Sequence, residues 1–578
     1  MQRYEKIFYL TNRFSIFNNF FYVKITLIFC LYFFYYRSAI TQQLILEAED
    51  AFLQGTLTKQ VSYSGYSGTG YVGNFSNDSD KLIFKFVVDS NSYYQLYIRY
   101  IAPYGNKNNI LYINENSIEV FYPSCNKFSE LNFGRIKLSK DSNTIIIAKS
   151  WGWFFIDCLK LITVNPDSLK FNLPYKLSTP EPSEESLRLF HFLCSYYGKN
   201  IISGVMEKSE ADWLKQKTGK YPALLGQDFM NHTRTYSWFN KNQIITNSIN
   251  WYNQNGIITI CWHWRDPSGN TDEFYTNKTN FDVSKIFDST STEYKFMLND
   301  IDTIAKYLKK LQSAHIPILF RPLHEASGGW FWWGAKGPEA CKKLWKTMFD
   351  RIVKFHGINN LIWVWTTDAS QENLQWYPGD SVVDILGLDI YSSSGDFSSK
   401  ILYFNKVKES FQAKKIITLS ENGVIPDPDK LITDEAYFSY FMTWFGSFVR
   451  DSSINPLTHW QKVLNHNYVI TLDEMPNLKT YPLLAEKKYE KEKSSKQIDN
   501  KFEIRISNNN LIIKLLDENI KFYNVSIYNL LGIKLKTLYK LYGENIIPLN
   551  KYTPCGIYLI NIFSDTFIEI HKILINKN

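Results

Sequence analysis

The sequence predicts a multidomain protein in which a (β/α)8 barrel of the TIM type is flanked by an N-terminal β-sandwich and a small C-terminal β-domain. The chain of 578 residues is too long for a single hydrophobic core. Between residues 187 and 478, short apolar runs alternate with helical stretches such as 293–313, as expected for a parallel barrel. On both sides of this region, apolar or alternating runs are separated by turn residues, which is typical of β-domains.

The first 41 residues are predicted to be a secretory signal. The apolar segment 23–36 follows Arg3, Lys6 and Arg13, and small residues follow at 38–41. Its core of about a dozen residues is shorter than the roughly 20 residues that a membrane-spanning helix needs. We therefore expect cleavage near Ala39 to Thr41, and an uncleaved membrane anchor is the alternative.

The β-sandwich is expected over residues 44–163. Runs such as 82–88, 94–100 and 144–148 alternate or remain apolar, and Gly, Asn, Asp and Ser lie between them. The polar stretch 164–186 is predicted to be a linker because it is interrupted by four prolines, Pro166, Pro174, Pro180 and Pro182.

The barrel is expected over residues 187–478, with seven or eight βα units. Seven apolar runs are its predicted strands: 201–205, 223–226, 257–261, 316–320, 361–365, 383–388 and 415–419. A second linker is predicted over 479–505, which includes the mixed-charge run 486–497. The last segment, 506–578, returns to strands with turn residues and forms the C-terminal β-domain.

Composition excludes some classes of function. The net charge is +8, but the basic residues form no stripe, so we expect no nucleic-acid partner. The six cysteines outside the signal segment have irregular spacing and form no Cys-x-x-Cys pair, which argues against zinc and redox motifs. A disulfide between Cys125 and Cys158 and unpaired buried thiols both remain open. We expect a monomer.

Two glutamates are the candidate catalytic residues. Glu325 follows the predicted fourth strand, and Glu421 follows the predicted seventh strand 96 residues later. Catalytic groups of such barrels lie at the C-terminal ends of strands, and strands four and seven face each other across the barrel mouth. Two converging carboxyls are the minimum that glycoside hydrolysis requires. The alternative is that each glutamate is only a structural ion-pair partner.

The run 321–334 places Glu325 beside four aromatic residues, 330–333, which follow Gly328 and Gly329. Flat indole rings stack on the apolar faces of sugar rings, so this run favours a carbohydrate substrate. We expect Trp330 to contact the sugar, and Trp332 and Trp333 to hold the loop in place.

The segments Arg321-Pro-Leu-His-Glu325 and Gly329-Trp-Phe-Trp-Trp-Gly334 resemble the signature of family 26 glycoside hydrolases, which are mostly endo-β-1,4-mannanases. The resemblance extends over about residues 190–475 and includes four further segments: Trp262-His263, Asp389-Ile-Tyr391, Ser420-Glu-Asn-Gly423 and Val469-Ile-Thr-Leu-Asp-Glu474. It implies a retaining mechanism that needs no cofactor and acts on β-mannan, with Glu325 as the acid/base and Glu421 as the nucleophile.

The same resemblance implies roles for seven other residues. Arg321 and His324 would hold Glu325 and sugar hydroxyls, and Trp444 would be the stacking platform. Tyr391 would hydrogen-bond the nucleophile with support from Asp389. The residues that line the subsite where the bond breaks would be His263, Trp330 and Tyr391. A satisfied core histidine is the alternative for His263.

Two features limit the assignment. Residues 326–327 are Ala-Ser, where many relatives carry a Met-Asn or Asn-type pair, so contacts on the aglycone side remain open. Asp228 and Asp368 lie near strand ends and are interpreted as hydrogen-bond partners without a catalytic role.

The alternative functions are a β-glucanase or β-1,3-xylanase of the same fold, and a non-catalytic surface protein that binds carbohydrate.

The N-terminal β-domain resembles family 35 carbohydrate-binding modules through Glu47-Ala-Glu49, Ser64-Gly-Tyr-Ser-Gly-Thr-Gly-Tyr71 and Trp151-Gly-Trp-Phe-Phe-Ile-Asp157. Glu47, Glu49 and Asp157 are hard oxygen donors that suit a structural Ca²⁺, and an ordinary acidic edge pair is the alternative. One of Trp151 and Trp153 is expected to stack on sugar, with Trp151 as the candidate, and the other is expected to belong to the core.

The C-terminal 70 residues resemble a type A sorting domain of the type IX secretion system. The matching residues are Val525-Ser-Ile-Tyr-Asn-Leu-Leu-Gly532, Gly556-Ile-Tyr-Leu-Ile560 and the basic end 572–577. This resemblance implies that type IX secretion machinery is a partner and that the protein is secreted or held at the outer-membrane surface. A small adhesive β-sandwich is the alternative.

Overall fold

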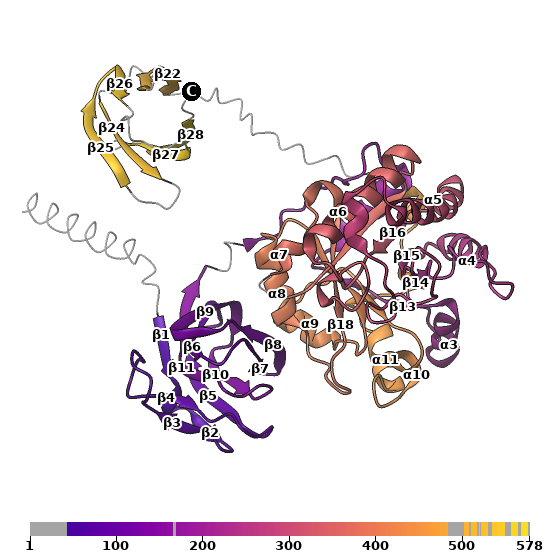
Figure 1. Ribbon diagram of the computed structural model, residues 1–578, viewed down its shortest axis with the longest axis horizontal. Helices are drawn as coiled ribbons and strands as arrows, with labels where there is room; N and C mark the ends of the chain where they lie inside the picture. The colour runs from indigo at the N-terminus through magenta and orange to yellow at the C-terminus, as the bar shows by residue number, and fades with distance from the viewer. Residues whose placement is uncertain are drawn as a thin grey trace, which may run out of the picture. The chain divides into compact units, whose positions relative to one another are not determined.

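The chain divides into two compact units between residues 486 and 487. The computed structural model (Figure 1) describes residues 43–165, 169–370 and 372–483 of the first unit, and 502–507, 510–516, 520, 522–529, 534–548, 556–563 and 568–575 of the second. The predicted signal segment, 1–41, lies outside the described residues. Within the described ranges, no helix is both long and apolar enough to cross a membrane.

The N-terminal part of the first unit is a sandwich of two antiparallel sheets. One sheet has the order β3-β4-β11-β6-β9 with β1 also paired to β11, and the other has the order β2-β5-β10-β7-β8. Burial alternates along strands such as β7, because successive side chains of a strand point to opposite faces. The strands are β1 Gln43–Glu47, β2 Phe52–Gln54, β3 Thr58–Gln60, β4 Tyr71–Gly73, β5 Lys81–Val88, β6 Ser92–Ala102, β7 Lys107–Ile113, β8 Asn116–Tyr122, β9 Cys125–Leu138, β10 Asp141–Ala148 and β11 Phe155–Val164.

The second part of this unit is a closed parallel barrel of eight strands, which confirms the predicted fold class. Strands such as β15 are buried along their whole length, since a parallel sheet is covered on both faces. The eighth strand, which has only three residues, was not among the seven predicted runs. The barrel strands are β13 Gly204–Met206, β14 Leu224–Asp228, β15 Ile257–Trp262, β16 Ile318–Pro322, β17 Leu361–Thr367, β18 Ile385–Ile390, β19 Ile416–Asn422 and β20 Phe441–Thr443. A short pair, β12 Ile201–Ile202 and β21 Val469–Ile470, lies outside the barrel.

Helices surround the barrel. The longest, α5, matches the predicted stretch 293–313: Ser291 Oγ caps it by accepting from the Tyr294 amide at 3.1 Å. Apolar side chains three or four positions apart form its buried face. The helices are α2 Glu184–Tyr196, α3 Lys208–Thr218, α4 Gln243–Tyr252, α5 Thr292–Ser313, α6 Pro338–Phe349, α7 Asn373–Trp376, α8 Ile401–Ser410, α9 Pro428–Asp434, α10 Ser447–Arg450 and α11 Leu457–Leu464. The short 3-10 and π segments are η1 Ala48–Asp50, η3 Val283–Phe287, η4 Ala326–Gly328, η5 Asp350–Phe355, η6 Asp380–Val382, η7 Leu472–Glu474 and η8 Leu478–Thr480.

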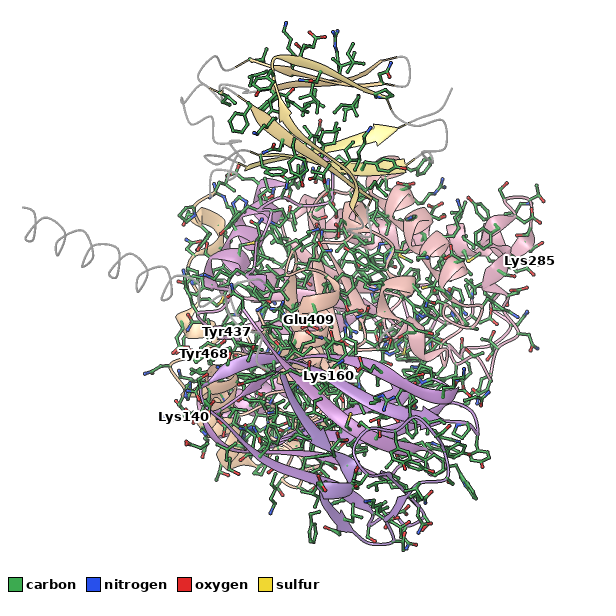
Figure 2. The ribbon with its side chains drawn as sticks, turned by 90° about the vertical axis from the view of Figure 1, so that its left-hand side faces the viewer. Lys140, Lys160, Lys285, Glu409, Tyr437 and Tyr468 are labelled. Atoms are coloured by element: carbon green, nitrogen blue, oxygen red, sulfur yellow. The ribbon has the colours of Figure 1, made fainter. Side chains whose placement is uncertain are left out.

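The sandwich packs against α8 and α9 of the barrel through polar contacts. The Arg135 amide of β9 donates to Glu409 of α8 at 2.9 Å, and Figure 2 marks Glu409 above the sandwich strands. Tyr93 of β6 donates its hydroxyl to Glu435 at 2.7 Å. The predicted linker, 164–186, also packs on the barrel, since Ser178 donates its amide to a buried carboxylate oxygen at 2.6 Å. The sandwich is therefore held to the barrel by hydrogen bonds as well as by chain connection.

The second unit has two antiparallel sheets, in the orders β22-β23-β26 and β25-β24-β27-β28. Its core contains Leu511, Ile513, Val525, Ile560 and Ile562, so the expected small β-domain is confirmed. Its strands are β22 Phe502–Ser507, β23 Asn510–Leu515, β24 Tyr523–Asn529, β25 Lys534–Leu541, β26 Glu544–Pro548, β27 Gly556–Phe563 and β28 Ile568–Ile575.

The cysteines of the described residues are all free. Cys125 and Cys158 lie on β9 and β11, and neither is in a disulfide. Of the two alternatives left open by the sequence, unpaired thiols are therefore correct for this pair. Cys30 and Cys555 lie outside the described residues.

Candidate active site

Three carboxylates meet at the C-terminal ends of the barrel strands. Glu325 follows β16, the fourth strand, whereas Asp389 and Glu421 lie near the ends of β18 and β19, the sixth and seventh. One oxygen of each carboxylate lies within 4.8 Å of an oxygen of the other two. The predicted convergence of Glu325 and Glu421 from opposite sides of the barrel is thus present in the structure.

Glu421 is buried and held from two sides. Arg321 of β16 donates to its Oε2, and the Tyr391 hydroxyl, just beyond β18, donates to its Oε1. The pairing of β18 with β19 shifts register between Leu388 and Asp389, so that Asp389 is paired with Glu421. Both oxygens of Glu421 accept hydrogen bonds, which fixes the plane of the carboxylate.

Arg321 links this carboxylate to Asp389. Its Nη1 donates to Asp389 Oδ2 at 2.6 Å, and the side chain is only 1% exposed. Burial lowers the pKa of the guanidinium, but the charges of Asp389 and Glu421 outweigh burial and raise that pKa above its ordinary value. Ser420 Oγ donates to the other oxygen of Asp389 at 2.6 Å. Ser420 fits beside β18 because position 387 is glycine, where a Cβ would lie 2.2 Å from Ser420 Oγ.

Glu325 has a different environment. It occupies the left-handed region at φ 54°, and its Oε2 accepts from Trp330 Nε1 at 3.0 Å. Burial raises the pKa of the Glu325 carboxyl above its ordinary value, and the negative charge of Glu421 adds to the rise. The two glutamates therefore lie in different environments, as a proton donor and a nucleophile must.

The glycines before Trp330 allow its indole to lie over the loop. A Cβ at position 328 would lie 2.0 Å from the Trp330 ring, and Gly329 has φ 70°, which favours glycine. Trp330 is 49% exposed, whereas Trp332 and Trp333 are fully buried. The expected division of the aromatic run into one exposed ring and two packing rings is confirmed.

His263, just beyond β15, belongs to a buried chain of hydrogen bonds. Its Nδ1 lies 2.7 Å from Asp228 Oδ2, and its Nε2 lies 3.1 Å from His324 Nε2. Burial lowers the pKa of His263, but the charge and hydrogen bond of Asp228 outweigh burial and raise it. Burial and the charge of His263 lower the pKa of His324 well below its ordinary value. His263 therefore links Asp228 to His324.

The partners of Arg321 and His324 correct one expectation. We expected both side chains to hold Glu325, but Arg321 contacts Asp389 and Glu421, and His324 contacts His263. Both side chains are buried, Arg321 on β16 and His324 just beyond it, whereas Glu325 lies on the following turn. Of the other predicted residues, Tyr391 is partly exposed, and Trp444 is partly buried with its ring 5.6 Å from the ring of His263.

Asp228 and Ser420 are positioning residues, of which the sequence singled out only Asp228, as a hydrogen-bond partner. Asp228 ends β14 and accepts from both the amide and the imidazole of His263. Its place at a strand end gave the predicted hydrogen-bonding role, and the structure identifies His263 as the partner. Ser420 gave no such signal, because its role depends on the register shift beside Asp389.

Family comparison agrees with this geometry. The sequence model of glycosyl hydrolase family 26 matches residues 178–474, a range that includes the whole barrel and every residue named above. The chain belongs to glycosyl hydrolase family 26. The model of carbohydrate binding module (family 35) matches residues 44–164, the extent of the sandwich.

Characterised relatives cover most of this family 26 chain. A mannan endo-1,4-beta-mannosidase of Thermothelomyces thermophilus is 38% identical over 441 residues, 74% of this chain and 90% of the relative. Mannan endo-1,4-beta-mannosidase B of Piromyces sp is 34% identical over 470 residues, 78% of this chain and 80% of the relative. The crystal structure of the Podospora anserina GH26-CBM35 beta-(1,4)-mannanase is 36% identical, has a TM-score of 0.53, and covers 76% of this chain and 99% of that chain.

Within the described part of this family 26 protein, two carboxylate-containing clusters have metal-ligand spacing: Asp228 with Cys261 and His263, and Glu325 with Asp389 and Glu421. In the first cluster, the close contact is the hydrogen bond between His263 and Asp228. In the second cluster, the Arg321 guanidinium pairs with Asp389 and Glu421 and so holds the carboxylates together. The predicted calcium residues Glu47, Glu49 and Asp157 are not among these clusters, and Arg99 forms an ion pair with Asp157.

The loop 65–69 of the sandwich nevertheless connects these three carboxylates. Ser67 donates its amide to Asp157 at 2.9 Å and its hydroxyl to Glu47 at 2.7 Å, and Glu49 accepts from the Thr69 amide. The second oxygen of Glu49 is buried and has no hydrogen-bond partner among the described residues. Trp151 and Trp153 are both exposed on the loop between β10 and β11, so the expectation that one of them belongs to the core is wrong.

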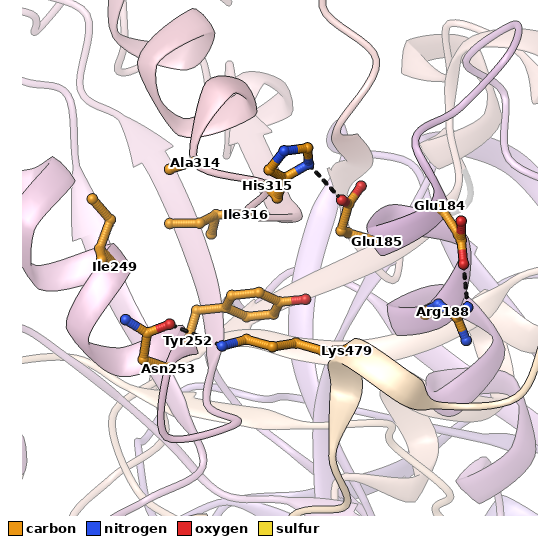
Figure 3. Close-up of a pocket in the computed structure, with 10 residues that line it drawn as sticks. All are labelled: Glu184, Glu185, Arg188, Ile249, Tyr252, Asn253, Ala314, His315, Ile316 and Lys479. Atoms are coloured by element: carbon orange, nitrogen blue, oxygen red, sulfur yellow. Dashed lines mark hydrogen bonds and ion pairs between the residues drawn. The ribbon is translucent and has the colours of Figure 1, made fainter.

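A pocket of about 400 Å³ lies far from the catalytic carboxylates, near the N-terminal ends of the barrel strands (Figure 3). Its wall includes His315, which precedes β16, and Tyr252, which ends α4. The Nδ1 atom of His315 lies 2.7 Å from Glu185. Catalytic residues of such barrels lie at the opposite end, so this pocket is not the active site.

Proposed function

We propose that the protein is a retaining endo-β-1,4-mannanase that hydrolyses mannan, glucomannan or galactomannan. The observation that carries the proposal is the Glu325–Glu421 pair, whose carboxylate oxygens approach within 4.8 Å. The relatives named above are mannan endo-1,4-β-mannosidases, and the two matched over most of their length support β-mannan as the substrate.

The separation of the carboxyls supports double displacement. Retaining enzymes place the two groups about 5–5.5 Å apart, whereas inverting enzymes need about 6.5–9.5 Å to admit a water between them. One oxygen of Glu325 and one oxygen of Glu421 lie within 4.8 Å of each other, which favours the shorter, retaining separation. Glu421 then attacks the anomeric carbon as the leaving oxygen takes the proton of Glu325. The ionised Glu325 next removes a proton from the water that releases the sugar from Glu421, and two inversions give net retention.

The surrounding residues supply orientation. Arg321 and Tyr391 direct the oxygens of Glu421, and burial keeps Glu325 protonated until it donates. Trp330 and Trp444 offer ring faces for the sugars, and His263 offers its edge beside Trp444. These groups complete the chemistry without a cofactor.

The sandwich is proposed to bind β-mannan, with Trp151 as a stacking residue and with a structural Ca²⁺ held by Glu47, Glu49 and Asp157. The all-oxygen donor set and the unpartnered Glu49 oxygen suit a hard cation, which would hold the loop 65–69 against the sheet. If so, calcium raises the melting temperature of the native chain and magnesium does not, and Glu49→Gln removes the difference. Equal melting temperatures of the native chain in calcium and in chelator would exclude the site.

Export is proposed on the sequence alone. The apolar segment 23–36 and the resemblance of the last 70 residues to a sorting domain both favour an enzyme that is secreted, or attached to the outer-membrane surface, by type IX secretion machinery. Fractionation of the native organism with an antibody against the barrel tests this, and retention in the cytoplasm would contradict it.

A substrate panel tests the main proposal. We expect reducing ends to form on mannan, glucomannan and galactomannan, and much more slowly on barley glucan and β-1,3-xylan. Proton NMR of early products should show the β anomer first, and Glu421→Ala should abolish turnover. Preference for barley glucan or β-1,3-xylan would favour the alternative substrates. Binding without turnover would favour a carbohydrate-binding protein.

A further inference from the structure

A groove of about 490 Å³ lies between the sandwich and the C-terminal end of the barrel. Strand β8 contributes Phe121 to one wall, and the opposite wall includes Ser327, Asp368, Ser370 and Trp376. We call this space the interdomain groove.

The interdomain groove adjoins the acid/base residue. Ser327 lies two positions after Glu325 on η4, and Asp368 directly follows β17, the fifth strand. Trp444 follows β20, the eighth strand, which faces the fourth across the barrel. Because Glu325 gives its proton to the leaving oxygen, the sugars of the leaving group lie on the side of Glu325. The groove therefore lies on the aglycone side, away from Trp444.

The lining suits a chain of sugars. Phe121 is 41% exposed and Trp376 is partly buried, so both present apolar faces. Asp368 and Ser370 supply hydrogen-bonding oxygens for hydroxyl groups. Oδ1 of Asn108, which also lines the groove, is buried and lacks a hydrogen-bond partner in the described part of the chain. Aromatic faces with a few polar groups are typical of sites that bind small polar molecules.

Contacts on both sides of the groove hold its two walls together. Lys406 of α8 donates its ammonium to the Phe133 carbonyl of β9, and the same nitrogen lies 4.2 Å from the centre of the Phe133 ring. Asn116, the first residue of β8, donates to Asp434 at 3.2 Å. The walls thus keep a fixed spacing, as a subsite must.

We propose that the interdomain groove is a distal aglycone subsite, formed jointly by the sandwich and the barrel, that binds the reducing-end sugars of the β-mannan chain during cleavage. This inference rests on the proposed mannanase function. It gives the sandwich a part in the catalytic cleft itself, in addition to binding polysaccharide elsewhere.

The test compares Phe121→Ala with Phe52→Ala. Phe52 is an exposed phenylalanine on β2, which forms the opposite edge of the same sheet from β8. Each full-length variant is assayed on mannohexaose and on dinitrophenyl β-mannobioside, which has no sugar on its aglycone side. We expect Phe121→Ala to lower kcat/KM on mannohexaose about tenfold and to leave the aryl substrate unchanged, since a lost stacking contact costs roughly one factor of ten. Phe52→Ala should change neither.

A second variant, on the opposite wall, tests the groove independently in case Phe121→Ala misfolds. Ser370 is exposed on the barrel wall of the groove, so Ser370→Trp should fill the groove and give the same selective loss. Unchanged kcat/KM on mannohexaose for both variants, in a wild-type enzyme that hydrolyses mannan, would overturn the subsite alone. A wild-type enzyme that is inactive on every β-mannan would instead overturn the proposed function, and with it this inference.

Discussion

Trp330 donates its indole N–H to Oε2 of Glu325 at 3.0 Å, so the residue that offers a ring face to the sugar also touches the proton donor. A hydrogen bond to a carboxylate stabilises its ionised form. The bond therefore moderates the rise in the pKa of Glu325 that burial and Glu421 cause.

Trp330→Phe keeps a ring but removes this donor. The pKa of Glu325 should rise, and the basic limb of the kcat/KM profile on mannohexaose should move to higher pH because Glu325 stays protonated longer. Trp332→Phe is the control, since the Trp332 indole donates to a backbone carbonyl instead. A basic limb that stays in place in Trp330→Phe would show that the bond does not tune the acid.

Glu325→Ala should lower kcat on mannan about 10²- to 10⁴-fold, the usual contribution of a general acid. The first step on dinitrophenyl β-mannobioside should be spared, because this leaving group needs no proton. Pre-steady-state release of dinitrophenol separates that step from the slower release of the sugar, and added azide should restore the second step. Equal losses on both substrates in the first step would contradict the acid role of Glu325.

Gly328→Ala tests whether the absence of a side chain at position 328 positions the Trp330 ring. Its Cβ would lie 2.0 Å from the ring, so the indole must move and kcat/KM on mannohexaose should fall about as far as in Trp330→Ala. In the Trp330→Ala background, the same Gly328→Ala change should have little further effect. Additive losses in the double variant would mean that Gly328 acts through the backbone instead.

Asp300 predicts a pH dependence of stability. This residue of α5 is buried, and its Oδ2 accepts from Trp264 Nε1 at 2.8 Å. Burial raises the pKa of Asp300 to about 7. Because the folded-state pKa lies above the unfolded value of about 3.9, the stabilisation is complete below about pH 4 and is lost as the pH rises to about 7.

The change Asp300→Asn should therefore raise the melting temperature at pH 8 and have little effect at pH 4. An asparagine keeps an oxygen for Trp264 but carries no charge to bury. Thermal melts at both pH values measure the difference. Asp302→Asn on the exposed face of the same helix is the control, and it should lower stability at pH 8 because Asp302 is paired with Arg351. Equal effects of Asp300→Asn at both pH values would contradict the raised pKa.

Much of the site follows from sequence because strand order and strand ends are encoded locally. Apolar runs located seven of the eight barrel strands, which was enough to place Glu325 after the fourth strand and Glu421 at the seventh. The three-residue β20 was missed because so short a strand cannot be told apart from the aromatic stretch 437–445 in which it lies. The partners of Arg321 and the role of Ser420 could not be predicted from the sequence. Both depend on the register between strands, and the place of Ser420 also depends on the space left by Gly387.

The contacts that join the sandwich to α8 and α9 also affect how the enzyme meets a solid particle. A module joined by a flexible linker would raise the local concentration of polymer around the cleft without fixing the direction in which the cleft faces. Here, Arg135 and Tyr93 fasten the sandwich to the barrel, so adsorption through Trp151 would also set the direction in which the cleft faces. Each adsorption event on an insoluble fibre would then present the carboxylates to the neighbouring polysaccharide chains in one orientation. The geometry of adsorption would therefore decide which chains are cut.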